Sequence, residues 1–174
     1  TVVDADLTAR SWTDGGLAAR SDRVAAWLRD DLGLRPGDAM IVMLNNTIEL
    51  WEVLLGLMKA GGVAIPTSTL LSPDDLAWRV RTAGARFAIA PTTLLDRFED
   101  VTGDLVRIGV GDDLPDGWVS YDASAAAAST FEPLAPTPAD SLSLLYFTSG
   151  TTSHPKLVRH NQVSYPIGHL STMY

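Results

Sequence analysis

The sequence predicts an α/β protein with a doubly wound, mostly parallel sheet and helices on both faces. Short apolar segments of strand length alternate along the chain with longer segments of helical periodicity. Turn signals rich in Gly, Pro and Asp separate the two kinds of segment. The chain has 174 residues, of which 46% are hydrophobic, so it can bury one sizeable core.

The first predicted helix covers residues 16–32 and ends at Gly33. Small and apolar side chains at helical spacing define its buried stripe: Leu17, Ser21, Val24, Leu28 and Leu32, with Trp27 beside them. A turn over residues 35–38 follows this helix. The apolar run 39–44 then suits a strand that is buried on both faces.

The second predicted helix covers residues 47–60 and is apolar nearly all round, which predicts that it is buried. Asn46 and Glu49 have the spacing of a capping pair at its start. Two glycines end the helix, and residues 63–66 form the next predicted strand.

The third predicted helix starts at Ser72, an N-cap followed by a proline and two acids that suit a helix N-terminus, and runs to Ala83. Residues 86–90 and 105–110 predict two further strands. Residues 92–101 between them predict a helix, which continues the alternation of a parallel sheet.

The segment 123–139 is rich in Ala, Ser, Pro and Thr and is interpreted as a connector with at most one short helix. Residues 141–147 form the last clear strand. The chain starts at Thr1, not Met, and no stop signal follows the apolar stretch before Tyr174. We therefore expect both ends to be cut, so that residues 1–174 are part of a larger domain.

Composition excludes several classes of function. A formal net charge of −8 argues against a nucleic-acid partner, because phosphate backbones are held by clustered Lys and Arg. The chain has no cysteine, which excludes disulfides, thiolate metal sites and cysteine nucleophiles. No stretch approaches the roughly 20 apolar residues of a membrane span, and no leader pattern is present, so we expect a soluble, cytoplasmic protein.

The loop at residues 146–156 carries the candidate chemistry, because it follows a buried strand at the end of the sheet where open α/β folds bind ligands. Hydroxyl groups and exposed backbone N–H groups can donate to the many acceptor oxygens of a polyphosphate, and a lysine can balance their charge. The candidate phosphate-binding residues are Thr148, Ser149, Gly150, Thr151, Thr152, Ser153 and Lys156. Lys156 is one of only two lysines in the chain.

Composition alone also allows a simple solvated loop rich in Ser and Thr. The loop is not a Walker P-loop, because Pro155 takes the second glycine position and Leu157 follows the lysine. Ser149 is not a hydrolase nucleophile, because its flanking glycine frame is missing.

The string YFTSGTTSHPK resembles the signature loop of the adenylate-forming superfamily, which includes acyl-CoA synthetases, luciferases and nonribosomal adenylation domains. Residues 11–27 and 57–66 are similar to the first two motifs of that family, so the resemblance spans nearly the whole chain. Residues 156–160 and 164–170 look most like bacterial acetyl- and medium-chain acyl-CoA synthetases. Ser153 departs from the pattern, because most members have glycine there.

The resemblance implies an acid-thiol ligase of fatty acid metabolism that uses ATP, Mg²⁺ and CoA. Its carboxylic substrate would be a short- or medium-chain fatty acid or a related acid. Lys156 would be a catalytic residue that contacts the phosphates with the loop, and no metal ligand is evident in this segment. The other nucleotide, magnesium and catalytic residues of the family would lie beyond Tyr174, so we expect the fragment alone to be inactive.

Two alternatives stay open at this point. One is an amino-acid or acyl adenylation domain that loads a carrier protein. The other is a truncated, non-catalytic scaffold module. The acid substrate and the oligomeric state are not encoded in any pattern of this segment.

Other conspicuous residues are interpreted as structural. The spacing of His154, His160 and His169 places no pair on one helical face. The tryptophans at apolar helix positions, Trp27, Trp51 and Trp78, are expected in the core. Acidic pairs such as Asp112 and Asp113 are interpreted as loop or helix-end charges.

Overall fold

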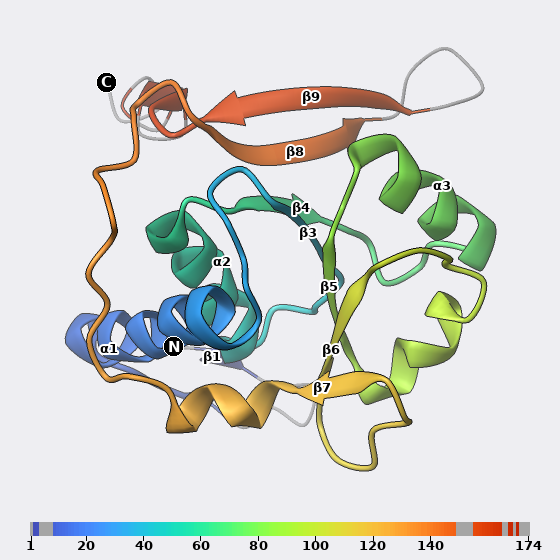
Figure 1. Ribbon diagram of the computed structural model, residues 1–174, viewed down its shortest axis with the longest axis horizontal. Helices are drawn as coiled ribbons and strands as arrows, with labels where there is room; N and C mark the ends of the chain where they lie inside the picture. The colour runs from blue at the N-terminus through green and yellow to red at the C-terminus, as the bar shows by residue number, and fades with distance from the viewer. Residues whose placement is uncertain (1, 4–8, 149–154, 165–166, 169, 171–174) are drawn as a thin grey trace.

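The structure is a computed structural model that describes residues 2–3, 9–148, 155–164, 167–168 and 170. Its centre is a seven-stranded sheet with the order β7-β6-β5-β3-β4-β8-β9 (Figure 1). The strands are β3 (Ala39–Val42), β4 (Val63–Pro66), β5 (Phe87–Pro91), β6 (Val106–Val110), β7 (Trp118–Ser120), β8 (Leu142–Thr148) and β9 (Lys156–Asn161). All neighbouring pairs are parallel except β8 and β9. The predicted doubly wound, mostly parallel sheet is confirmed.

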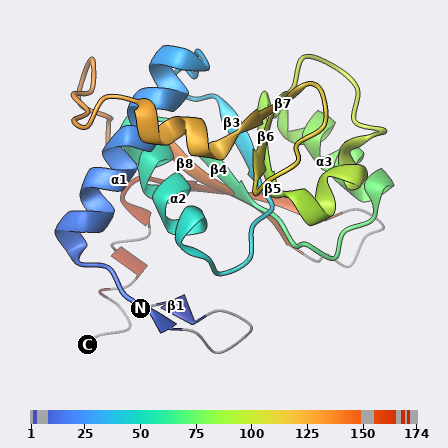
Figure 2. The ribbon, with the colours of Figure 1, turned by 90° about the horizontal axis from the view of Figure 1, so that it is seen from below.

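Helices cover both faces of this sheet (Figures 1 and 2). One face carries α1 (Asp14–Ala26), its π-helical continuation η1 (Trp27–Asp31), α2 (Ile48–Ala60) and the 3₁₀ helix η3 (Tyr121–Ala126). The other face carries α3 (Pro73–Ala83) and the 3₁₀ helix η2 (Thr92–Phe98). A separate two-stranded sheet pairs β1 (Val2–Val3) with β2 (Ala9–Arg10).

Alternation along the strands divides the core into two clusters. In β3, Met40 and Val42 pack toward α1 and α2, whereas Ile41 packs toward α3. Successive side chains of a strand point to opposite faces, and here both faces are covered. The strand is therefore a continuous apolar run without polar alternation, as its sequence predicted.

One of the two predicted helix N-caps is confirmed. The hydroxyl of Ser72 accepts a hydrogen bond from the N–H of Asp75 at 3.2 Å, as predicted for α3. The predicted helix at residues 47–60 is present as α2, but its predicted cap was wrong: Thr47 is the N-cap residue, and the side chain of Asn46 accepts a hydrogen bond from the indole N–H of Trp51. The amide oxygen of Asn46 is thus used by the indole of Trp51, and the Thr47 side chain makes no cap hydrogen bond.

Two further predictions need correction, and two strands were not predicted. Residues 92–98 form a 3₁₀ helix, not an α-helix to residue 101. Trp51 is 45% exposed, although it was expected in the core. The edge strands β7 and β9 were not predicted, because edge strands are half-exposed and lack a continuous apolar run.

The connector crosses from the β7 edge to β8 over α1 and η1 (Figure 1). Its start is the short helix η3. Arg23 of α1 donates hydrogen bonds to the carbonyls of Ala125 and Ala127, and Arg29 donates to the carbonyl of Glu132. Two arginines from one helical segment thus fix the path of the connector. Within the described part of the chain, no helix is long and apolar enough to cross a membrane.

Candidate functional site

The candidate site lies where β8 ends. The parallel strands point their carboxyl ends toward one edge of the sheet, and Leu144 of β8 pairs with Ala64 of β4. Pro66, the last residue of β4, is therefore level with Tyr146, and Thr148 lies two positions beyond it. The end of β8 thus projects past its neighbour, at the edge where open α/β sheets bind ligands.

Thr148 and Lys156 are brought together by the turn of the chain. They are paired residues at the end of the antiparallel β8–β9 ladder. The Thr148 hydroxyl donates a long hydrogen bond of 3.4 Å to the Lys156 carbonyl. Both residues are exposed. The other predicted phosphate-binding residues, Ser149, Gly150, Thr151, Thr152 and Ser153, lie outside the described residues.

The two lysines of the chain have opposite surroundings. Lys59 forms an ion pair with Asp22 at 2.6 Å and donates to the Ser21 hydroxyl and the Ala18 carbonyl. Among the described residues, the ammonium of Lys156 has no hydrogen-bond or ion-pair partner. Lys59 is therefore neutralised within the fold, whereas Lys156 has no counter-charge among the residues that the structure describes.

Aromatic contacts hold the end of β8 at Phe147, the residue before Thr148. The Phe147 ring packs against Trp78 of α3 with 5.5 Å between ring centroids. The Arg79 guanidinium carbon lies 4.7 Å from the centre of the same ring, a cation–π contact. Burial lowers the pKa of Arg79, and the charge of Asp75 partly opposes this effect. Helix α3 thus clamps the residue that precedes Thr148.

Sequence reasoning missed this clamp. Trp78 was expected in the core, and it is half-buried against Phe147. The contact joins residues 69 positions apart (147 − 78), and helical periodicity gives no information about such pairing. On the hairpin itself, Tyr146 and His160 pack edge to face at 5.6 Å, which gives His160 a structural role. His154 and His169 lie outside the described residues.

A second polar cluster is buried away from the candidate site. Glu52 of α2 is 2% exposed, and its carboxylate forms an ion pair with Arg20 and accepts a hydrogen bond of 2.5 Å from the Tyr121 hydroxyl. Burial raises the pKa of the Tyr121 phenol, and the Glu52 carboxylate raises it further. Trp27 packs edge-on against Tyr121. The cluster ties α1, α2 and η3 together on one face of the sheet.

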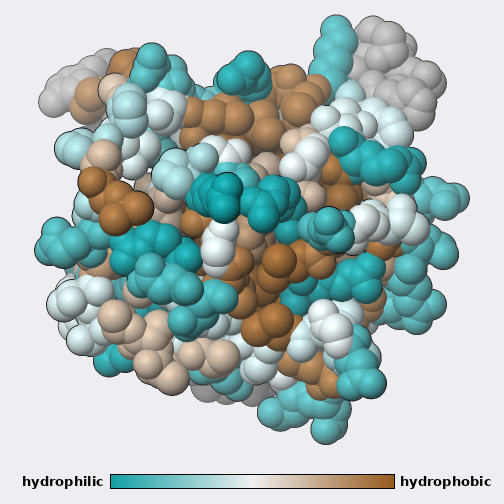
Figure 3. Space-filling view, viewed as in Figure 1, coloured by the Kyte–Doolittle hydropathy of each residue, from teal (hydrophilic) through white to brown (hydrophobic). Residues whose placement is uncertain are grey.

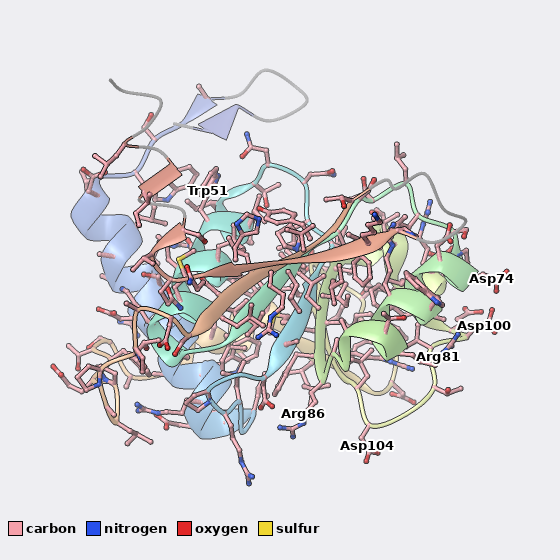
Figure 4. All side chains as sticks on the ribbon, turned by 90° about the horizontal axis from the view of Figure 1, so that it is seen from above. Trp51, Asp74, Arg81, Arg86, Asp100 and Asp104 are labelled. Carbon is pink, nitrogen blue, oxygen red and sulfur yellow. The ribbon has the colours of Figure 1, made fainter. Side chains whose placement is uncertain are left out.

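The described residues contain no group of three or more His, Asp or Glu side chains that could hold a metal ion. Acidic side chains such as Asp74, Asp100 and Asp104 are exposed at the surface (Figure 4). The described chemistry of the site is therefore a free lysine, a threonine hydroxyl and the edge of a parallel sheet.

The fold is that of an α/β protein with a mostly parallel sheet, and Thr148 and Lys156 lie together where β8 ends. The family model "AMP-binding enzyme" matches residues 2–172. The chain belongs to the AMP-binding enzyme family.

Curated relatives carry acyl-CoA ligase names. The chain is 35% identical over 164 residues to YtcI, an uncharacterized acyl-CoA ligase of Bacillus subtilis (strain 168). The matched region covers 93% of this chain and 30% of YtcI. The chain is 30% identical over 174 residues to the mitochondrial acyl-coenzyme A synthetase ACSM5 of Mus musculus, with 98% and 30% covered. The chain therefore spans 30% of the length of these two curated relatives.

A solved structure shares the fold. The crystal structure of the Brucella canis acyl-CoA synthetase superposes with a TM-score of 0.84 at 27% identity, covering 92% of this chain and 30% of that one. The mostly parallel sheet and its helices thus match the N-terminal domain of adenylate-forming enzymes. The chain is part of an AMP-binding domain.

Proposed function

We propose that the protein containing this chain is an AMP-forming acid-CoA ligase, and that residues 146–156 hold the β- and γ-phosphates of ATP. The observation that carries the proposal is the exposed Lys156, which has no partner among the described residues and is paired with Thr148 where β8 ends. The names of the curated relatives favour CoA over a carrier protein as the acceptor.

In the proposed first step, a carboxylate oxygen attacks the α-phosphorus of ATP and the bond to pyrophosphate breaks. In the second step, the CoA thiol displaces AMP from the acyl-adenylate and its proton is released. Lys156 would stabilise the negative charge that develops on the leaving pyrophosphate. The Thr148 hydroxyl, held only by a long hydrogen bond, would be free to turn toward a phosphate oxygen.

The loop between these two residues would complete the phosphate site. Ser149, Gly150, Thr151, Thr152 and Ser153 would contribute hydroxyl and backbone N–H donors. The described residues offer no carboxylate cluster that fits the implied magnesium ion, so no role in holding it is assigned to them. A short- or medium-chain fatty acid or a related acid is the proposed substrate, and the cytoplasm is the proposed location.

The test is ATP–pyrophosphate exchange by the full-length protein over a series of carboxylic acids. We expect Lys156→Ala to lower the exchange rate by about 10²- to 10³-fold, as removal of a comparable electrostatic group does in other enzymes. Arg159→Ala is the matched control, because it removes an exposed cation from the same strand. Unchanged exchange in Lys156→Ala, or an equal loss in Arg159→Ala, would overturn the proposed role.

The described part of the domain lacks most of the site that the family resemblance implies. We therefore expect residues 1–174 alone to form no acyl-adenylate. Detection of labelled adenylate after incubation of this fragment with ATP and an acid mixture would contradict that expectation.

A further inference from the structure

A cavity of about 620 Å³ lies at the opposite end of the sheet from Thr148. It opens between the turn before β3, the end of α2 and the connector, and Ser141 and Leu142 at the start of β8 complete it. Arg86, which precedes β5, marks this amino-terminal end of the strands, whereas Trp51 lies toward the other end (Figure 4). The cavity is therefore distinct from the proposed phosphate site. Its size falls within the range of small-molecule sites, about 300 to 1,000 Å³.

The walls of the cavity are mostly apolar and stiff. The connector contributes Pro133, Leu134, Pro136 and Pro138, and each proline fixes one backbone angle. Arg29 anchors this wall, because it donates to the Glu132 carbonyl and its guanidinium lies 4.4 Å from the centre of the Phe131 ring. The space-filling view of this face shows polar and apolar residues mixed over its surface (Figure 3). Water against such walls is readily displaced by an apolar ligand.

Three cationic residues border the cavity, and one of them, Arg35, has no charged partner among the residues that the structure describes. Arg29 is paired with Asp30, and Lys59 is paired with Asp22. The Arg35 guanidinium is exposed and has no ion-pair or hydrogen-bond partner among the described residues. The nearby Asp38 carboxylate instead accepts from the Arg35 backbone N–H at 2.8 Å and from Arg86 at 2.7 Å. The cavity thus combines an apolar interior with one free guanidinium.

We propose that this cavity binds a small amphipathic monocarboxylate, with its apolar chain or ring against the proline-rich wall and its carboxylate on Arg35. A guanidinium can bind a carboxylate through two parallel hydrogen bonds, which suits this headgroup better than an alcohol or an amine. The inference does not depend on the proposed function, because none of the cavity residues belongs to the phosphate loop.

The test is photolabelling of the full-length protein with a diazirine derivative of octanoic acid, followed by mass spectrometry of the labelled peptides. We expect label in residues 131–138 and competition by octanoate but not by octylamine. The label should persist in Lys156→Ala, which separates this site from the proposed catalytic one. Label confined to other parts of the protein would overturn the proposal. The same result is expected if another segment of the full-length chain fills the cavity, and it would overturn the proposal equally.

Two variants of one residue, one charged and one neutral, keep the test independent of folding. Leu134 is 88% exposed, so it can be replaced without loss of core packing. Leu134→Glu places a negative charge at the cavity, and we expect it to reduce labelling of residues 131–138 at least fivefold. Leu134→Gln has a similar size and no charge and should retain most of the label. Equal labelling of the two variants would show that the cavity does not recognise the carboxylate.

Arg35→Gln should lower the labelling as Leu134→Glu does. Its control is Arg81→Gln, which removes an exposed arginine of α3 that does not line the cavity (Figure 4). Retained labelling in Arg35→Gln would overturn the assignment of the carboxylate to Arg35.

Discussion

Phe147 of β8 lies under the guanidinium of Arg79, with 4.7 Å between the guanidinium carbon and the centre of the ring. This contact joins α3 to the strand residue that immediately precedes Thr148. The position of the proposed phosphate site thus depends on helix packing as well as on the loop sequence. A site held in this way can be tested by changing residues that would not contact the nucleotide.

Phe147→Ala removes the ring that both Trp78 and Arg79 contact. We expect the free energy of unfolding to fall by about 1 to 3 kcal/mol, less than for a fully buried phenylalanine because Phe147 is half-buried. We also expect weaker ATP binding by the full-length protein, because the end of β8 loses its support. Denaturant unfolding and equilibrium binding measure the two effects.

The matched control for this variant is Phe131→Ala. Phe131 is also half-buried under an arginine, Arg29, but it lies in the connector at the other end of the sheet. It should lose comparable stability and keep its ATP affinity. Equal losses of ATP affinity in the two variants would show that α3 does not position the site.

Tyr121→Phe tests the buried cluster with Glu52. Loss of the hydroxyl leaves part of a buried carboxylate without a donor, so we expect a loss of about 1 to 3 kcal/mol at neutral pH. The pKa of Tyr121 is raised in the folded state, so above pH 10 the unfolded chain releases this proton while the folded chain keeps it. Wild-type stability should therefore fall with rising pH through this range.

The pH dependence of the variant completes this test. Tyr121→Phe should lack that part of the alkaline decline, which is at most about 1.4 kcal/mol per pH unit. Urea unfolding of both proteins between pH 8 and 11 measures the difference. Parallel stability curves would contradict a tyrosine that stays protonated in the fold.

Gly61→Ala tests the end of α2. Gly61 has a positive φ of 72°, and an added Cβ would lie 3.2 Å from the Cβ of Pro36. We expect a loss of at least about 1 to 2 kcal/mol in the free energy of unfolding, because the left-handed conformation disfavours a side chain. Gly15→Ala is the control: it is helical with open space around its Cα, and it should be neutral or stabilising. The idea fails if both alanines have the same effect.

The sequence alone predicts the parallel core of the fold well. Residues 39–42, 63–66 and 87–91 are buried on both faces, so their apolar runs are unambiguous. The edge strands β7 and β9 are half-exposed and have no such signal. Burial of Glu52 was also not predictable, because its partners Arg20 and Tyr121 are 32 and 69 residues away in the chain.

The residue types of the candidate site could be predicted from the sequence, but the contacts that hold the site in place could not. The pairing of Thr148 with Lys156 follows from a hairpin that the local sequence did not indicate, and the clamp by Trp78 and Arg79 is a long-range contact. The contrast between Lys59 and Lys156 also required the structure, because the sequence does not show which carboxylates lie near each lysine. Which lysine is neutralised depends on the position of Asp22 across the α1–α2 packing.

The most direct test of the central claim is an experimental structure of the full-length protein with a non-hydrolysable ATP analogue. The proposal predicts that the β- and γ-phosphates lie against the loop between Thr148 and Lys156, with the lysine ammonium at about 2.7 to 2.9 Å from a phosphate oxygen. Phosphates bound elsewhere, with Lys156 still free in solvent, would contradict it.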